Sequence, residues 1–202
     1  ENAFVICQNG RTVGVFPQLP AQFDGIPVRD VGEQLVIPGM NDLHLHAPQY
    51  AFHGMYMDLE LLEWLNTVTF PEEARYSDLN YAEKAYSIFA DDLKKSATTR
   101  ASIFGTLHVD ATELLMDLME KTGLKAFIGK VKALQEESAV VSATDTVRWL
   151  NDIAGKYENV KPILTPRFTP SCSDELMSRL AEIQRAYCLP VQSHLSENKS
   201  EI

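Results

Sequence analysis

Two of the five histidines in this 202-residue chain stand two positions apart, in the segment LHLHAPQY that runs from residue 43 to residue 50. If this segment ends a strand, His44 and His46 project to the same face, because successive side chains of a strand alternate between faces. Two imidazoles on one face are suited to chelating a metal ion, since neutral imidazole is a common metal ligand. The structural alternative is a pair of histidines on the polar face of a sheet, and the motif alone leaves both interpretations open.

A third histidine, His194, stands in the segment PVQSHLSENKSEI. A catalytic zinc site typically has three protein ligands and a water whose pKa falls toward about 7, and His44, His46 and His194 are candidates for these ligands. Glu197 follows His194 by three residues, so it is a candidate general acid and base that reaches the water without necessarily binding the ion. The alternatives are a histidine satisfied within the core and an exposed loop carboxylate.

These side chains need a scaffold that brings distant parts of the chain together. Short apolar segments that indicate buried strands start near residues 98, 124, 160 and 190 and alternate with helical patterns. Their period of about 30 residues is that of a βαβ unit, so the predicted sheet is parallel. Parallel sheets of this kind, open or closed into a (β/α)8 barrel, carry their sites at the carboxyl ends of the strands, where His46, Arg167 and His194 are expected.

The helices between these strands can be placed by their apolar spacing. Residues 79–93 carry apolar side chains at intervals of three and four, which predicts a helix with Ser77 or Asp78 as its N-cap. Asp110 and Glu113 resemble a capping box at the start of another helix.

Residues 1–38 differ from the rest. Two apolar runs flank Asn9-Gly10, a dipeptide that favours a two-residue hairpin turn, so this part is predicted to be β.

Composition excludes several classes of partner. With 18 Lys+Arg against 28 Asp+Glu, the net charge is −10, so the chain offers no positive field for nucleic acid or for an anionic membrane surface. No apolar run approaches the roughly 18 residues of a spanning helix, and the first residues lack the pattern of a secretion signal. We therefore expect a soluble cytoplasmic protein. Three widely spaced cysteines argue against a disulfide framework.

Several longer segments resemble guanine deaminases of the amidohydrolase superfamily. They are PGMNDLHLHAPQYAFHG, MDLELLEWLNTVTFPEE, VKPILTPRFTPSCSDELM and PVQSHLSENKSEI, and the similarity runs along most of residues 36–202. It implies a (β/α)8 TIM-type barrel with a small flanking β domain. Residues 1–38 would be the N-terminal part of a small β-sandwich domain, and residues 39–202 the first part of the barrel, about five βα units without the C-terminal strands.

The resemblance also implies a cofactor, a reaction and an assembly. It assigns one Zn²⁺ per subunit, with Fe²⁺ as the alternative metal, to His44, His46 and His194, and proton transfer to Glu197. The implied reaction is the hydrolytic deamination of guanine to xanthine and ammonia in purine catabolism, with attack of the activated water at guanine C2. A homodimer is implied as well.

The same resemblance implies that three further residues contact the substrate: Gln49 in HAPQ, and Arg167 and Phe168 in TPRF. The Gln49 amide offers a donor and an acceptor to a purine edge, the Arg167 guanidinium offers a planar fork of donors, and the Phe168 ring can stack on a base. The alternatives are a loop amide facing water, a salt-bridge arginine and core filling, respectively.

One part of the family pattern lacks a counterpart. The family has a later histidine and a zinc-binding aspartate near the end of the eighth barrel strand, so we expect the sequence to omit parts of a longer protein. Two other functions remain open: a related amidohydrolase that acts on another amino-purine or a triazine, and a non-catalytic barrel fragment.

Overall fold

The computed structural model describes residues 3–132 and 138–199 and consists of two compact units, residues 1–38 and 39–202. In the first unit, β1 (Phe4–Gln8) and β2 (Arg11–Phe16) form an antiparallel hairpin. Asn9 and Gly10 connect the strands with φ values of 52° and 71°, as a two-residue hairpin turn of the primed type requires. The predicted hairpin is confirmed, and the assignment of this unit to a β-sandwich stays a prediction.

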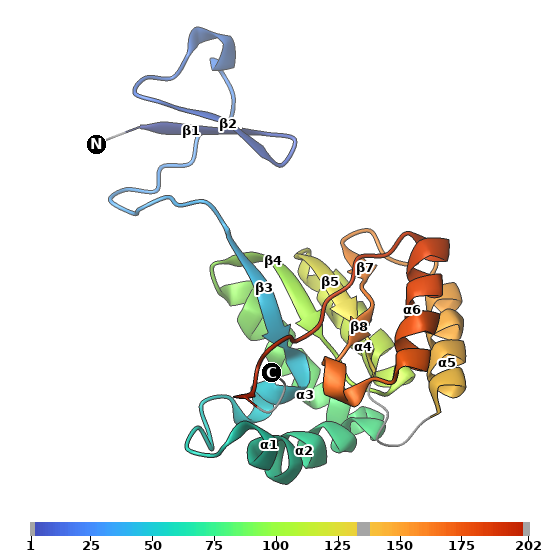
Figure 1. Cartoon of the computed structure of the whole chain (residues 1–202). Helices are drawn as coiled ribbons and strands as arrows, with labels where there is room; N and C mark the ends of the chain where they lie inside the picture. The colour runs from blue at the N-terminus through green and yellow to red at the C-terminus, as the bar shows by residue number, and fades with distance from the viewer. Residues whose placement is uncertain (1–2, 133–137, 200–202) are drawn as a thin grey trace. The chain divides into compact units, whose positions relative to one another are not determined.

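The second unit contains a four-stranded parallel sheet in the order β3-β4-β5-β7 (Figure 1). Its strands are β3 (Met40–His46), β4 (Thr98–Phe104), β5 (Lys125–Gly129) and β7 (Val160–Pro162). The predicted α/β fold with a parallel sheet is confirmed. Strands that lie side by side in chain order, with helices between them, are the arrangement of the first units of a (β/α)8 barrel.

The later strands are shorter than the sequence pattern predicts. The apolar segment that starts at residue 160 forms two pieces, β7 and β8 (Thr165–Pro166), and β8 pairs with β6 (Val131–Lys132). Each piece ends on a proline, which has no amide hydrogen for a ladder bond. The segment after residue 190 pairs only through isolated parallel bridges, from Val191 to Leu164 and from His194 to Phe168.

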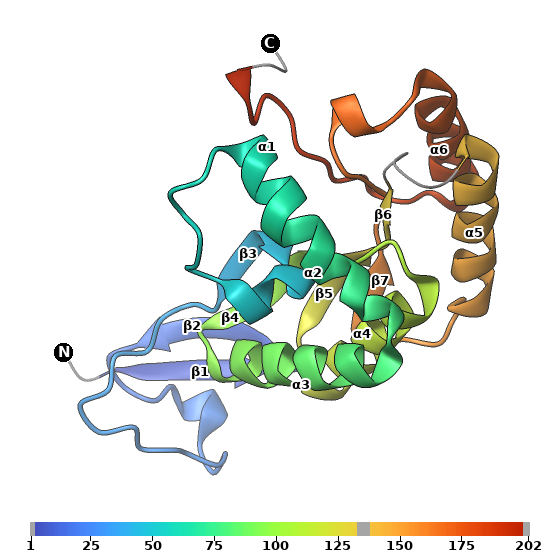
Figure 2. The ribbon, with the colours of Figure 1, turned by 90° about the horizontal axis from the view of Figure 1, so that it is seen from below.

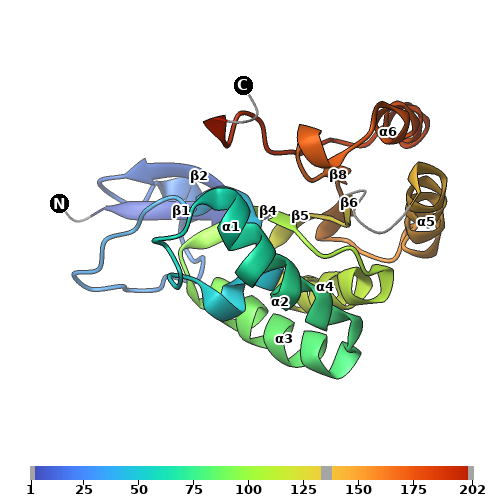
Figure 3. The same cartoon turned by 60° about the horizontal axis from the view of Figure 1, so that its bottom comes forward.

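Helices cover the sheet and fix the positions of its strand ends. They are α1 (Leu61–Trp64), α2 (Phe70–Ala74), α3 (Leu79–Lys95), α4 (Val109–Thr122), α5 (Ala139–Asp152) and α6 (Asp174–Tyr187), with 3-10 turns η1 (Ala21–Phe23), η2 (Ala47–Phe52), η4 (Arg75–Ser77) and η5 (Thr169–Ser171) and a π-helical turn η3 (Leu65–Thr69). Figure 2 shows α3 beside α4, and Figure 3 shows α5 beside α6. Buried side chains of α3 and α4, such as Tyr86 and Leu115, join Ile103 and Ile128 of the sheet in one core.

The predicted helix caps have mixed outcomes. Asp78 is the N-cap of α3 and accepts a hydrogen bond from the Asn80 amide at 2.9 Å, as predicted. The capping box of Asp110 and Glu113 is wrong, because α4 begins at Val109 and has no side-chain cap bond at its N-cap residue. Val109 is buried, so the helix starts before Asp110 and places Val109 in the core.

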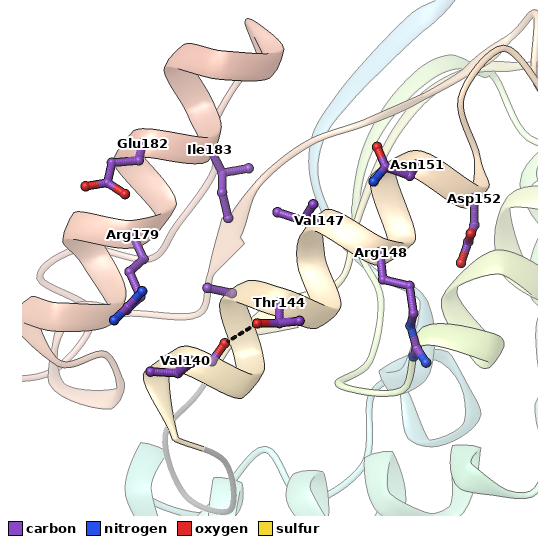
Figure 4. A pocket seen from close by; sticks show the side chains of 10 residues that line it. Val140, Thr144, Val147, Arg148, Asn151, Asp152, Arg179, Glu182 and Ile183 are labelled. Atoms are coloured by element: carbon purple, nitrogen blue, oxygen red, sulfur yellow. Dashed lines mark hydrogen bonds between the residues drawn. The ribbon is translucent and has the colours of Figure 1, made fainter.

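A groove of about 590 Å³ lies between α5 and α6. In Figure 4, Val147 of α5 and Ile183 of α6 face each other across it, and Arg148 and Arg179 stand among its other lining residues. The groove shares no residue with the histidine motif. Within the described residues, none of the helices has the length and apolar character needed to cross a lipid bilayer.

Candidate metal centre and active site

The structure brings His44, His46 and His194 together, with one ligand atom of each within 4.8 Å of the others. The Nε2 atom of His194 lies 3.0 Å from Nε2 of His46 and 3.2 Å from Nε2 of His44. Three ring nitrogens thus face a common point. Among the described residues, these three side chains are the only such group of histidines, cysteines and carboxylates.

Backbone hydrogen bonds fix the two chain segments that carry the three histidines. His44 and His46 occupy alternate positions at the end of β3, and His46 pairs with Phe104 at the end of β4. The His194 amide donates to the Arg167 carbonyl at 3.0 Å, and its ring Nδ1 lies 2.6 Å from the same oxygen. Since a carbonyl only accepts, Nδ1 is the donor of this bond, which leaves Nε2 as the ring atom that faces the cluster.

Phe104 forms the floor of the cluster. Its ring stacks on His46 with a centroid separation of 4.4 Å and lies 5.1 Å from His44 and 4.6 Å from His194. At 1% exposure, it keeps water from one side of the imidazoles. Phe104 is not among the predicted site residues, although its place as the last residue of a buried strand was a usable signal.

The surroundings of His44 and His46 favour neutral imidazoles. Burial lowers the pKa of His46 well below its ordinary value, and the positive charge of Arg167 lowers it further. Burial and the neighbouring His194 also lower the pKa of His44, against the opposing effect of the Glu197 and Asp42 carboxylates. A neutral ring is the form that binds a metal ion.

The donor set fits a zinc-type ion. Tetrahedral zinc with Zn–N bonds of about 2.0–2.1 Å separates its nitrogen ligands by about 3.3 Å, which is close to the two Nε2 separations of 3.0 and 3.2 Å. Lone pairs at this distance repel one another unless a proton or a cation lies between them. His44, His46 and His194 are therefore the residues that would hold the metal.

Gln49 and Arg167 meet at a carboxylate, Glu73, that is not among the predicted site residues. Glu73 of α2 accepts hydrogen bonds from Nη1 of Arg167 at 2.6 Å and from Nη2 at 3.2 Å. It also accepts a longer one from the Gln49 amide at 3.4 Å, and that amide nitrogen lies 3.2 Å from Nδ1 of His46. The salt-bridge alternative for Arg167 is thus realised, in direct connection with the histidine cluster.

The two other predicted site residues lie next to this network. Phe168 follows Arg167, is half-buried, and forms a parallel bridge with His194. Glu197 is exposed and close enough to His44 for its charge to raise the pKa of that histidine. The substrate contacts of Gln49, Arg167 and Phe168 and the proton transfer by Glu197 stay predictions.

Comparisons with known proteins agree with this geometry. Residues 35–202 match the model of the amidohydrolase family. Guanine deaminase of Mus musculus is 43% identical over 177 residues, which cover 84% of this chain and 39% of the relative. Guanine deaminase of Escherichia coli (strain K12) is 35% identical over 187 residues, which cover 89% of this chain and 42% of the relative.

A solved structure extends the likeness to three dimensions. The crystal structure of guanine deaminase from C. acetobutylicum with bound guanine in the active site superimposes with a TM-score of 0.93 at 44% sequence identity, covering 99% of this chain and 49% of that one. The chain thus spans about half the length of this protein, and less of the two curated relatives. With three imidazoles gathered in one cluster and the family model matched over residues 35–202, this chain belongs to the amidohydrolase family.

Proposed function

We propose that this chain carries the first part of the active site of a zinc-dependent guanine deaminase. The observation that supports this most directly is the convergence of three Nε2 atoms, from His44, His46 and His194, in a chain 43% identical to a guanine deaminase. The proposed reaction is the hydrolysis of guanine to xanthine and ammonia. A cytoplasmic location and a homodimer belong to the same proposal and rest on the family resemblance.

Each residue has a distinct part in this proposal. The three histidines would hold the zinc ion, which would supply a Lewis acid that makes a water nucleophilic at neutral pH. Glu197, three residues after His194, takes a proton from the attacking water and gives one to the departing amine, so that ammonia leaves. Gln49 and Arg167 orient the purine by hydrogen bonds, and Phe168 stacks on its face.

The Glu197→Gln variant tests the proposed proton transfer. We expect the purified variant to keep its zinc, because Glu197 is not among the three ligands, and to lose about 10²- to 10⁴-fold in guanine turnover. Ammonia release and elemental analysis measure the two quantities, and Glu175→Gln, at an exposed carboxylate of α6 paired with Arg179, is the matched control. Turnover near that of the control would reject the role of Glu197.

Ammonia release across guanine, adenine and an amino-triazine tests the substrate. Guanine is expected to give the highest kcat/KM. The assay uses the full-length, zinc-loaded protein that contains this chain. Preferential turnover of another amino-purine or of the triazine would assign the chain to a different amidohydrolase, and absence of turnover with all three would favour a non-catalytic role. Elemental analysis of the purified protein decides between zinc and iron.

A further inference from the structure

Helix α2 presents two side chains, Phe70 and Glu73, to the guanidinium of Arg167. We propose that Glu73 is a positioning residue that holds Arg167 in place and cancels its charge, so that the site selects an uncharged purine over an anionic one. This inference rests on the proposed function, in which Arg167 contacts the base. It assigns a role to the segment TFPEE, which the sequence marked only as part of the family resemblance.

The contacts leave the guanidinium little freedom. Arg167 and Glu73 are 4% and 7% exposed, and two nitrogens of the fork donate to the two oxygens of the carboxylate at 2.6 and 3.2 Å. The Phe70 ring lies on the guanidinium, with its centroid 4.9 Å from the central carbon. A bidentate pair with a ring against it fixes the plane of the fork, and three of its five N–H groups remain to meet other acceptors.

Glu73 also connects two segments that are far apart in sequence. Its Oε1 atom accepts from Nη2 of Arg167 and, at 3.4 Å, from the amide of Gln49. The Arg167 carbonyl in turn accepts from the ring of His194. One buried carboxylate therefore sets the relative placement of both proposed hydrogen-bonding contacts to the purine, beside a metal ligand.

The local helix geometry explains why Phe70 and Glu73 face this way. The π-helical turn η3, Leu65–Thr69, comes immediately before α2. A π-turn rotates the helix that follows it relative to a regular α-helix, and such turns are frequent at functional sites. Phe70 and Glu73 stand three residues apart on the rotated helix, and therefore share one face.

The charge balance leads to a preference among ligands. A buried guanidinium without a partner attracts an anion strongly, because the interior screens charge poorly. With Glu73 beside it, Arg167 keeps its donors and the ion pair as a whole carries no net charge, so a neutral base satisfies the guanidinium and a carboxylate or phosphate gains little. Removing the charge of Glu73 is expected to reverse this preference.

The test compares Glu73→Gln with the unmodified protein, using the full-length protein that contains this chain, loaded with zinc. Glu72→Gln is the matched control, since Glu72 is the adjacent carboxylate of α2 and accepts from Arg75 and Tyr81 instead. We expect KM for guanine to rise about tenfold with kcat and zinc content nearly unchanged, the pattern of lost binding that is equal in the ground and transition states. The direct readout is the Kd of purine-6-carboxylate relative to purine-6-carboxamide, two probes that differ in charge. Glu73→Gln is expected to shift this ratio about tenfold toward the carboxylate.

The outcomes separate this inference from the proposed function. If the ratio of the two Kd values for Glu73→Gln lies within twofold of the ratio for Glu72→Gln, the inference is overturned. If Glu73→Gln does not fold, Glu73→Asp takes its place. This variant keeps the negative charge, so guanine binding should weaken while the affinity for the carboxylate probe does not rise. A rise in that affinity would also overturn the inference. Lack of guanine turnover by the unmodified full-length protein would reject the proposed function, while the ratio for the two probes still decides the role of Glu73.

Discussion

Glu120, near the end of α4, ties that helix to the start of β7. Its carboxylate accepts hydrogen bonds from the backbone amides of Glu158, Asn159 and Val160 at 2.9 to 3.2 Å, and from the Asn159 side chain at 2.9 Å. This segment leads into β7, which is followed by β8 and then by Arg167. Replacing Glu120 should therefore destabilise the part of the sheet that carries the proposed purine contact.

The size of the effect follows from the burial of each donor. Val160 is 1% exposed, so Glu120→Ala leaves its amide buried without an acceptor, at a cost of about 1–3 kcal/mol. The donors of Glu158 and Asn159 are more accessible to water, so they add about 1 kcal/mol together. We expect the free energy of unfolding to fall by about 2–4 kcal/mol in Glu120→Ala and by about half of that in Glu120→Gln, which keeps one acceptor oxygen.

The same contacts make the contribution of Glu120 depend on pH. Burial by itself raises the pKa of Glu120, but the hydrogen bonds from the amides of Asn159, Val160 and Glu158 outweigh it, so the pKa is lowered in the folded protein. A lowered pKa means that the stabilisation is complete above the unfolded value of about 4.3 and is lost as the pH falls through the folded value. The difference in unfolding free energy between the unmodified protein and Glu120→Gln should therefore shrink from pH 7 toward pH 3.

Urea denaturation followed by circular dichroism at several pH values measures these differences. Glu83→Gln, at an exposed carboxylate of α3, controls for the loss of a surface charge. A loss below about 0.5 kcal/mol for Glu120→Ala at pH 7, no larger than ordinary surface substitutions give, would refute the reasoning. A difference for Glu120→Gln that stays constant down to pH 3 would refute the pH argument alone.

Three further predictions concern the core, a helix cap and the metal. In Gly129→Ala the new Cβ would overlap with Oγ1 of Thr165 and lie 2.7 Å from the Ile163 carbonyl. We therefore expect the free energy of unfolding to fall by about 1–3 kcal/mol through overpacking. An unchanged melting temperature would contradict the close approach of these segments. Asp78→Ala removes the N-cap of α3 and should lower the free energy of unfolding in urea by about 1 kcal/mol. The control Asp91→Ala, at an exposed position of the same helix, should leave it almost unchanged. Zinc at a hundredfold excess over its Kd should stabilise the chelator-treated protein by about 2.7 kcal/mol, measured by thermal unfolding. The His44→Ala variant should lose this stabilisation. If the variant keeps it, the ion binds at another site.

The features that the sequence determined by itself are local ones. The positive φ values of Asn9 and Gly10, the Asp78 cap and the presence of His44 and His46 on one strand end follow from turn chemistry, capping and strand alternation, which involve residues close in the chain. The parallel order of the strands followed from the repeated strand and helix pattern. Where a local signal competed with burial, as at Asp110 and Val109, the core prevailed.

Only the tertiary structure decided which distant side chains meet. His194 reaches His46 across 148 positions, and Arg167 finds Glu73 across 94. No local pattern distinguishes Glu73 from its neighbour Glu72, since both are carboxylates of one short helix. The packing of α2 after its π-helical turn buries one of them against Arg167 and leaves the other paired with Arg75, because adjacent residues of a helix point about 100° apart.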